Sequence, residues 1–219
     1  MAGTTHAATP LSFFEHRAIY REPMLQVPNL YSNVSQAVFK AFHEWNVQLE
    51  HVSYKQNPVN LGEISVTFAL LAGRIDFTVG LGASHLLVRD PNWSEVDLVT
   101  RIAKAGIRAA VDSAGVTVTQ QRSTIAMHLK PVSGQIKEFV TGLMRPTEGL
   151  LTGEDVLGYG FSLYKQDSSW VVDTSAVYPE ALFVRIQRLS GAGASFEQIA
   201  ATLREDETSL FGLLRLDVD

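Results

Sequence analysis

The strongest constraint on the fold is a stretch in which apolar and polar residues alternate around two tight turns. From Leu61 to Asp90 it reads LGEISVTFALLAGRIDFTVGLGASHLLVRD. Turns at Ala72-Gly73 and Leu81-Gly82 predict three antiparallel strands whose apolar residues share one face, because a one-residue slip would turn that face to water. The predicted cross-strand pairs are Leu70 with Ile75, Phe68 with Phe77, Val66 with Val79, Val79 with Ser84, Phe77 with Leu86, and Ile75 with Val88.

Helical periodicity flanks this meander on both sides. Before it, Asn33 and Gln36 form a capping pattern, and apolar residues recur at helical spacing as far as Trp45. After it, Trp93 begins a second helix that Gly115 ends. We expect residues 1–10 to be a mobile N-terminus and residues 12–28 to be extended.

The second half of the chain repeats this order of elements without repeating its residues. The expected elements are an extended segment at 116–131, a short helix at 133–144, strands at 157–166, 169–175 and 181–189, and a closing helix at 195–214. Prolines and glycines predict a flexible loop at 145–155. Each half therefore reads as an extended segment, a short helix, several strands and a long helix.

This order predicts an α+β fold of two sequential β-α-β-α passes, with three or four strands in each meander and antiparallel sheets packed on long helices. We expect a first unit at residues 11–115 and a second at 116–219, packed as one globular body. The element order resembles the TATA-binding-protein-like and helix-grip arrangements, in which a sheet curls around a long helix. The DNA-binding face of the first family is basic, whereas this chain places Glu63, Asp76 and hydroxyl residues there, so that function does not carry over.

Composition and charge exclude several classes of function. The chain has 219 residues, 46% of them hydrophobic, no cysteine, and a net charge of -5. Disulfides and thiolate chemistry are therefore excluded, and an acidic chain is not expected to bind nucleic acid. The sequence shows neither a secretory leader nor a membrane-spanning apolar run. We expect a soluble, cytoplasmic protein without membrane contact.

No local motif for metal, nucleotide or nucleophilic chemistry is complete. His43-Glu44 lacks the second histidine of a zinc helix, because Val47 occupies its place. The glycine loop in LSGAGASFEQIA (residues 189–200) lacks the third glycine of a dinucleotide fingerprint, and Ser195 with Gln198 instead predicts a capping box. His128 alternates with apolar residues and is expected at the surface. We expect no catalytic residue, metal or cofactor.

One cluster of polar residues is a candidate binding site. The predicted register places five residues on the polar face of the meander: Arg74, Asp76, Thr78, His85 and Arg89. Two arginines directly opposite each other repel unless an anion lies between them. Asp76 is one candidate for this anion. The alternative is an external carboxylate or phosphate bound by the two arginines, with His85 placed to exchange a proton with it.

Two functions stay open from the sequence. The first is a non-enzymatic protein-binding or assembly module that presents sheet edges, or the arginine-bearing sheet face, to a protein partner or to a second copy of itself. The alternative is a pocket protein of helix-grip type that binds a small anionic ligand and could be an enzyme.

Overall fold

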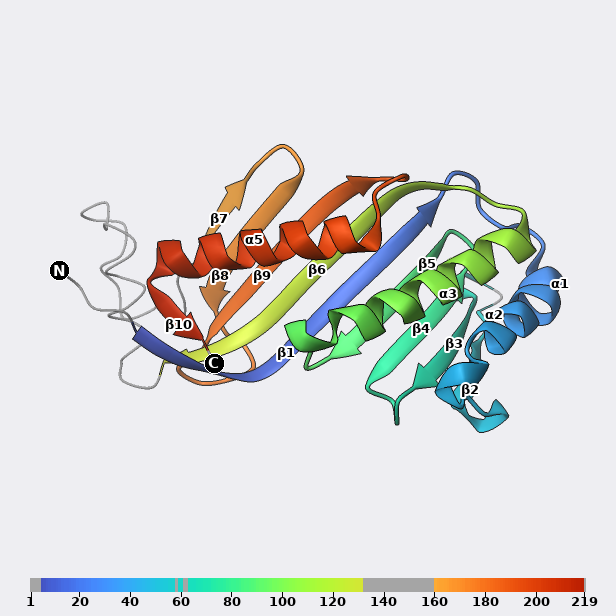
Figure 1. Cartoon of the computed structure of the whole chain (residues 1–219), viewed down its shortest axis with the longest axis horizontal. Helices are drawn as coiled ribbons and strands as arrows, with labels where there is room; N and C mark the ends of the chain where they lie inside the picture. The colour runs from blue at the N-terminus through green and yellow to red at the C-terminus, as the bar shows by residue number, and fades with distance from the viewer. Residues whose placement is uncertain (1–4, 58, 61–62, 132–159, 219) are drawn as a thin grey trace. The chain divides into compact units, whose positions relative to one another are not determined.

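The computed structural model describes residues 5–57, 59–60, 63–131 and 160–218, and its strands form one mostly antiparallel sheet (Figure 1). The sheet has 10 strands in the order β2-β3-β4-β5-β1-β6-β9-β8-β7, with β10 paired to β1. The predicted fold class, two β-α-β-α passes of sheets packed on long helices, is therefore wrong: the described residues hold few helices. The physical reason is that β1 and β6, predicted to begin separate passes, are neighbours in the same sheet.

The described chain divides into two compact units, each built from separate stretches of sequence. Unit 1 comprises Met1–Ser12, Ile125–Arg188 and Thr202–Asp219, and unit 2 comprises Phe13–Thr124 and Leu189–Ala201. The division of the chain into consecutive units at residues 115 and 116 stays a prediction.

The strands include most of the predicted segments and two that were not predicted, β2 and β10. Their bounds are β1 Thr5–Tyr20, β2 Val52–Lys55, β3 Ser65–Leu70, β4 Ile75–Gly80, β5 Ala83–Arg89, β6 Val118–Pro131, β7 Gly160–Tyr164, β8 Ser168–Thr174, β9 Leu182–Gly191 and β10 Leu216–Val218. β1 begins at Thr5, so part of the segment expected to be a mobile terminus lies in a strand. β10 holds it there by parallel pairing, with Thr5 opposite Leu216.

The helices confirm the predicted end of one helix and correct the predicted start of another. Their bounds are α1 Val27–Asn29, η1 Leu30–Val34, α2 Ser35–Ala41, η2 His43–Trp45, η3 Leu49–His51, η5 Trp93–Glu95, α3 Val96–Ala114 and α5 Phe196–Leu214. Gly115 ends α3 in the left-handed conformation, as predicted. Asn33 does not cap a helix, because the helical segment already begins at Val27 and Asn33 donates a hydrogen bond to Asn29 instead. The helix and loop predicted at 133–155 lie outside the described residues.

The register predicted for the meander is confirmed at all six pairs. Phe77 lies opposite Phe68 on β3 and opposite Leu86 on β5, and the other four pairs match as well. The apolar residues of this face are buried. The first turn reaches positive φ at Leu71, Ala72 and Gly73, so its strained conformation begins one residue earlier than the glycine signal indicates.

Helix α3 packs on this apolar face through Gly106, a residue that has no side chain. Figure 1 shows α3 lying over β4 and β5 with α2 beside it. Gly106 of α3 faces the rings of Phe42 and Phe77, and a Cβ at this position would lie 2.7 Å from carbons of both rings. The two rings stand edge to face with centroids 5.2 Å apart. The glycine therefore sets how closely α3 approaches the sheet.

The glycine loop before α5 turns its carbonyl groups toward Gln121 of β6. The Gln121 amide nitrogen donates to the carbonyl oxygens of Gly191, Ala192 and Ala194 at 3.2, 3.3 and 2.9 Å. The predicted capping box is confirmed, with Ser195 N donating to Gln198 at 3.0 Å and Gln198 N donating to the Ser195 hydroxyl at 3.2 Å. The loop thus serves as a strand-to-helix connection.

Within unit 1, α5 is tied to the sheet by a buried carboxylate. Asp206 accepts hydrogen bonds from Arg188 of β9 at 2.8 Å, and Lys165 lies 3.6 Å from its other oxygen. Two cations therefore neutralise a side chain that would be costly to bury alone. Lys165 also lies 3.7 Å above the centre of the Trp170 ring.

No helix within the described residues is long and apolar enough to cross a membrane.

We expect Gly106→Ala to lower the free energy of unfolding by about 1–3 kcal/mol, because the added methyl group overpacks the contact with Phe42 and Phe77. Gly212→Ala in α5 is the matched control: its Cβ meets nothing within 4 Å, so the better helix propensity of alanine should stabilise by up to about 1 kcal/mol. Urea unfolding of both variants checks this. Equal effects at the two positions would contradict the packing argument.

Candidate partner-binding surface

The five predicted site residues lie together on one face of unit 2. Asp76 and Thr78 belong to β4 and His85 and Arg89 to β5, while Arg74 ends the turn before β4. Their side chains are partly exposed, on the face opposite the buried apolar residues. The structure therefore brings the predicted set together.

Each of the two arginines has its own carboxylate. Arg74 forms a two-pronged ion pair with Glu95 at the start of α3, one contact being 2.8 Å. Arg89 contacts Asp76 at 2.6 Å and also donates to the Gly73 carbonyl. The Arg74 guanidinium holds the pKa of Glu95 below its usual value. The predicted repulsion is thus relieved internally, and binding of an external anion by these arginines stays a prediction.

Thr78 and His85 belong to a row of polar residues that crosses five strands. Cross-strand pairing joins Ser53 to Thr67, Thr67 to Thr78, Thr78 to His85, and His85 to Arg17, and we name these five residues the polar row. The hydroxyls of Thr67 and Thr78 share a hydrogen bond of 2.8 Å. The row places three hydroxyls, an imidazole and a guanidinium along one line of the sheet.

Arg17 is the site residue that the sequence did not reveal. It lies on β1, exposed, and has no carboxylate partner among the described residues. Burial lowers the pKa of His85; Glu15, whose carboxylate is 3.9 Å away, acts in the opposite direction, and the charge of Arg17 lowers this pKa further. No local signal links positions 17 and 85, since only the pairing of β1 with β5 makes them neighbours.

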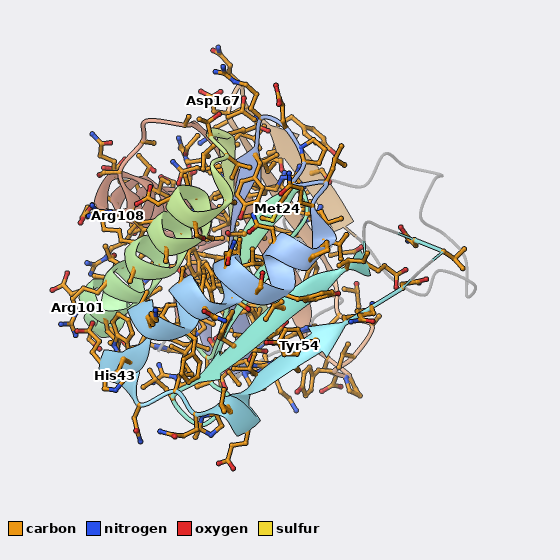
Figure 2. All side chains as sticks on the ribbon, turned by 90° about the vertical axis from the view of Figure 1, so that its right-hand side faces the viewer. Met24, His43, Tyr54, Arg101, Arg108 and Asp167 are labelled. Carbon is orange, nitrogen blue, oxygen red and sulfur yellow. The ribbon has the colours of Figure 1, made fainter. Side chains whose placement is uncertain are left out.

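The row ends at β2, which is the terminal strand of the sheet on this side. Among the described strands, β2 pairs with β3 alone, leaving its other edge without a paired strand. Exposed apolar side chains lie in and beside it: Leu49, Tyr54 and Val59 are 79%, 52% and 93% exposed. Figure 2 shows Tyr54 on this strand at the margin of unit 2, below the helical segment that contains α2. The edge therefore combines free main-chain groups with apolar contacts.

An aromatic pair holds this edge in place. The rings of Tyr31 from η1 and Tyr54 from β2 meet edge to face at 5.4 Å. The Tyr31 hydroxyl donates a hydrogen bond of 3.0 Å to the carbonyl oxygen of Lys55. Lys55 in turn pairs with Glu63 at 3.1 Å. These contacts tie a strand of four residues to the body of unit 2 and preorganise its outer edge.

The buried face of unit 2 carries a separate polar set, which the sequence also did not reveal. His16 of β1 is fully buried, and its Nδ1 lies 2.8 Å from the Ser123 hydroxyl. Its ring packs edge to face against Phe196 at 5.0 Å, and its Nε2 has no hydrogen-bond partner among the described residues. Burial lowers the pKa of His16 to about 4, an effect that Gln121 opposes and His85 adds to. His16 is therefore neutral at pH 7.

This surface offers the main-chain groups of the β2 edge and the side chains of the polar row for contact with another molecule. In the part of the chain that the structure describes, no three histidine or acidic side chains are grouped to hold a metal ion. On the buried face, the hydroxyl of Tyr20 shares a hydrogen bond of 2.6 Å with Ser84 and has its pKa raised to about 12, chiefly by burial. It stays protonated at neutral pH.

Comparison with known proteins identifies no family. No family model and no curated protein matches the chain. Among solved structures, the chain is similar to the PH1819 protein from Pyrococcus horikoshii OT3, at 7% sequence identity over 94% of this chain and 79% of that chain. The TM-score is 0.21, and the likeness therefore supports no conclusion about fold or function.

A double-mutant cycle of Arg89→Gln and Asp76→Asn should give a coupling energy of about 0.5–1 kcal/mol, as for a partly exposed ion pair. The control cycle combines Arg74→Gln with Asp76→Asn. It should show coupling below about 0.3 kcal/mol, because Arg74 is paired with Glu95. Urea unfolding measures both, and equal coupling in the two cycles would contradict separate pairing.

The buried His16 should make stability fall as the pH is lowered. Its folded pKa of about 4 lies below the ordinary value of 6.5, so the unfolded chain binds more protons between these values, and the stability present above pH 6.5 is lost progressively toward pH 4. This amounts to about 2 kcal/mol between pH 6.5 and 5. Urea unfolding of the wild type and of His16→Gln should show the steeper pH dependence in the wild type. Parallel curves would count against the shifted pKa.

Proposed function

We propose that the protein is an assembly module that joins the free edge of β2 to the same strand of a second copy. The observation that supports this is the edge itself, which combines an unpaired side among the described strands with the exposed Leu49, Tyr54 and Val59. Strand addition of this kind gains affinity from main-chain hydrogen bonds and specificity from alternating side chains. A two-fold dimer uses the same patch on both copies.

The residues of β2 suit antiparallel pairing with themselves. Centred on Ser53, the pairing sets Ser53 opposite Ser53 of the second copy and Val52 opposite its Tyr54. A β-branched residue opposite an aromatic residue is a favourable cross-strand pair, and no like charges meet directly at these positions. The same centre places Lys55 opposite His51 of the second copy. Self-pairing is therefore compatible with every side chain of the strand.

This arrangement also gives the polar row a role. Ser53 is the end of the row, so pairing at Ser53 continues the row from one copy into the other on the same face. The hydroxyl of Thr67, on the strand next to β2, then borders the interface on the polar face, and that of Thr78 follows one strand further in. Tyr31 and Tyr54 supply apolar contact on the opposite face. The two faces of the edge thus offer different chemistry, which would select one register.

Charge substitutions at Ser53 test the proposal. Ser53→Lys and Ser53→Glu should each abolish the dimer, because like charges would lie directly opposite each other. Mixing the two variants should restore it, since lysine would then face glutamate. Size-exclusion chromatography with light scattering measures the mass of each variant alone and of the mixture. Ser53 is exposed, so neither substitution should disturb the fold.

The matched control is the same pair of substitutions at Ser162 in β7, the terminal strand at the other end of the sheet order. Ser162 is also exposed, and its variants should leave the dimer intact. A wild type that is monomeric at high protein concentration would refute self-assembly. Loss of the dimer in the Ser162 variants, with the Ser53 variants unaffected, would assign the interface to β7 instead.

A further inference from the structure

A second histidine and serine pair lies in unit 1, far along the sequence from the proposed dimer edge. The Nδ1 atom of His128 in β6 is 2.8 Å from the hydroxyl oxygen of Ser175, which follows β8. His128 is 7% exposed, contrary to the surface position predicted for it, and Ser175 is partly exposed. The hydroxyl of a partly exposed serine thus contacts a largely buried imidazole.

The hydrogen bonds around Ser175 determine where its proton points. The main-chain N–H groups of Val177 and Tyr178 donate to the Ser175 oxygen at 3.2 and 2.9 Å. A hydroxyl oxygen has two lone pairs, which these donors occupy, so its hydrogen is directed to Nδ1 of His128. His128 therefore accepts at Nδ1 and carries its own proton on Nε2. This is the arrangement of a base that is ready to take a hydroxyl proton.

The surroundings fix both partners of the pair. The His128 ring lies 5.2 Å from the ring of Tyr178 and 5.4 Å from that of Phe183, measured between centroids. The main-chain N–H of Ser175 donates to the carbonyl oxygen of Ala181 at 2.7 Å, which closes the turn. Burial lowers the pKa of His128, which favours the neutral imidazole. Neither side chain needs to move before proton transfer.

We propose that Ser175 and His128 form a nucleophile and general-base pair that accepts an acyl group from a small apolar ester. One of the two main-chain hydrogen bonds to Ser175 Oγ opens, and the lone pair that this frees forms a bond to the ester carbonyl carbon. The hydroxyl proton moves to Nδ1 of His128, and the π electron pair of the carbonyl group moves to its oxygen. The tetrahedral intermediate then expels the alcohol, which takes the proton from Nδ1. Water hydrolyses the acyl-serine with the same imidazole as base.

The substrate class follows from what borders the hydroxyl. The side chain of Val177 is 65% exposed beside Ser175, and Tyr178 is partly exposed on the same turn. An apolar acyl group could contact the Val177 and Tyr178 side chains. This activity is independent of strand pairing at β2.

A fluorophosphonate probe tests the pair directly. Its reaction forms an Oγ–P bond, breaks the P–F bond, releases fluoride and transfers the hydroxyl proton to His128. Intact mass and peptide mapping of the full chain should locate a single adduct on Ser175. His128→Gln keeps a hydrogen-bond acceptor but cannot take the proton, so labelling should slow at least a hundredfold, the typical contribution of a general base.

The serine and histidine pair in unit 2, also among the described residues, is the internal control. Ser123 and His16 are also 2.8 Å apart but are 1% and 0% exposed, so Ser123 should stay unlabelled and Ser123→Ala should leave the rate at Ser175 unchanged. Mapping the wild type needs no variant, so the test does not depend on whether a substituted chain folds. No adduct above the level of the urea-unfolded chain, an adduct elsewhere, or labelling of Ser175 that His128→Gln does not slow would overturn the proposal.

Discussion

The close approach of α3 to the meander is the contact on which unit 2 depends. Phe42 and Phe77 fill the space beside Gly106, and a methyl group at that position would collide with both rings. The helix packs closely on the apolar face of the meander because it carries only a hydrogen there. With one face of the sheet closed in this way, the polar row is confined to the other face. The surface chemistry of unit 2 is thus a consequence of a packing contact on its opposite side.

The sequence predicted those features whose causes lie close together in the chain. Alternation of apolar residues fixed the register around Phe77, and Gly115 marked the end of α3, because turns and caps depend on residues only a few positions apart. The capping box at Ser195 and Gln198 was confirmed for the same reason. In these segments local chemistry and tertiary structure favour the same conformation.

The remaining features depend on pairings between distant segments. The two expected passes belong to one sheet because β1 and β6 are neighbours, which neither strand's own pattern reveals. Arg17 joins the candidate site through the pairing of β1 with β5, and β10 is too short for its residues to show a period. His128 alternates as a surface residue would, yet contacts from Tyr178 and Phe183 bury it. These pairings and contacts form only when distant segments come together in the sheet, so no local sequence pattern predicts them.

The contacts of Gln121 imply that residue 121 tolerates substitution less well than the loop residues before α5 to which it donates. One amide nitrogen, with two hydrogens, serves three carbonyl oxygens of the loop before the helix. All three acceptors are main-chain atoms, so the residues at 191, 192 and 194 can vary without removing an acceptor. A change at position 121 would instead release three carbonyl groups at once. Related sequences should therefore drift in the loop while keeping an amide donor on β6.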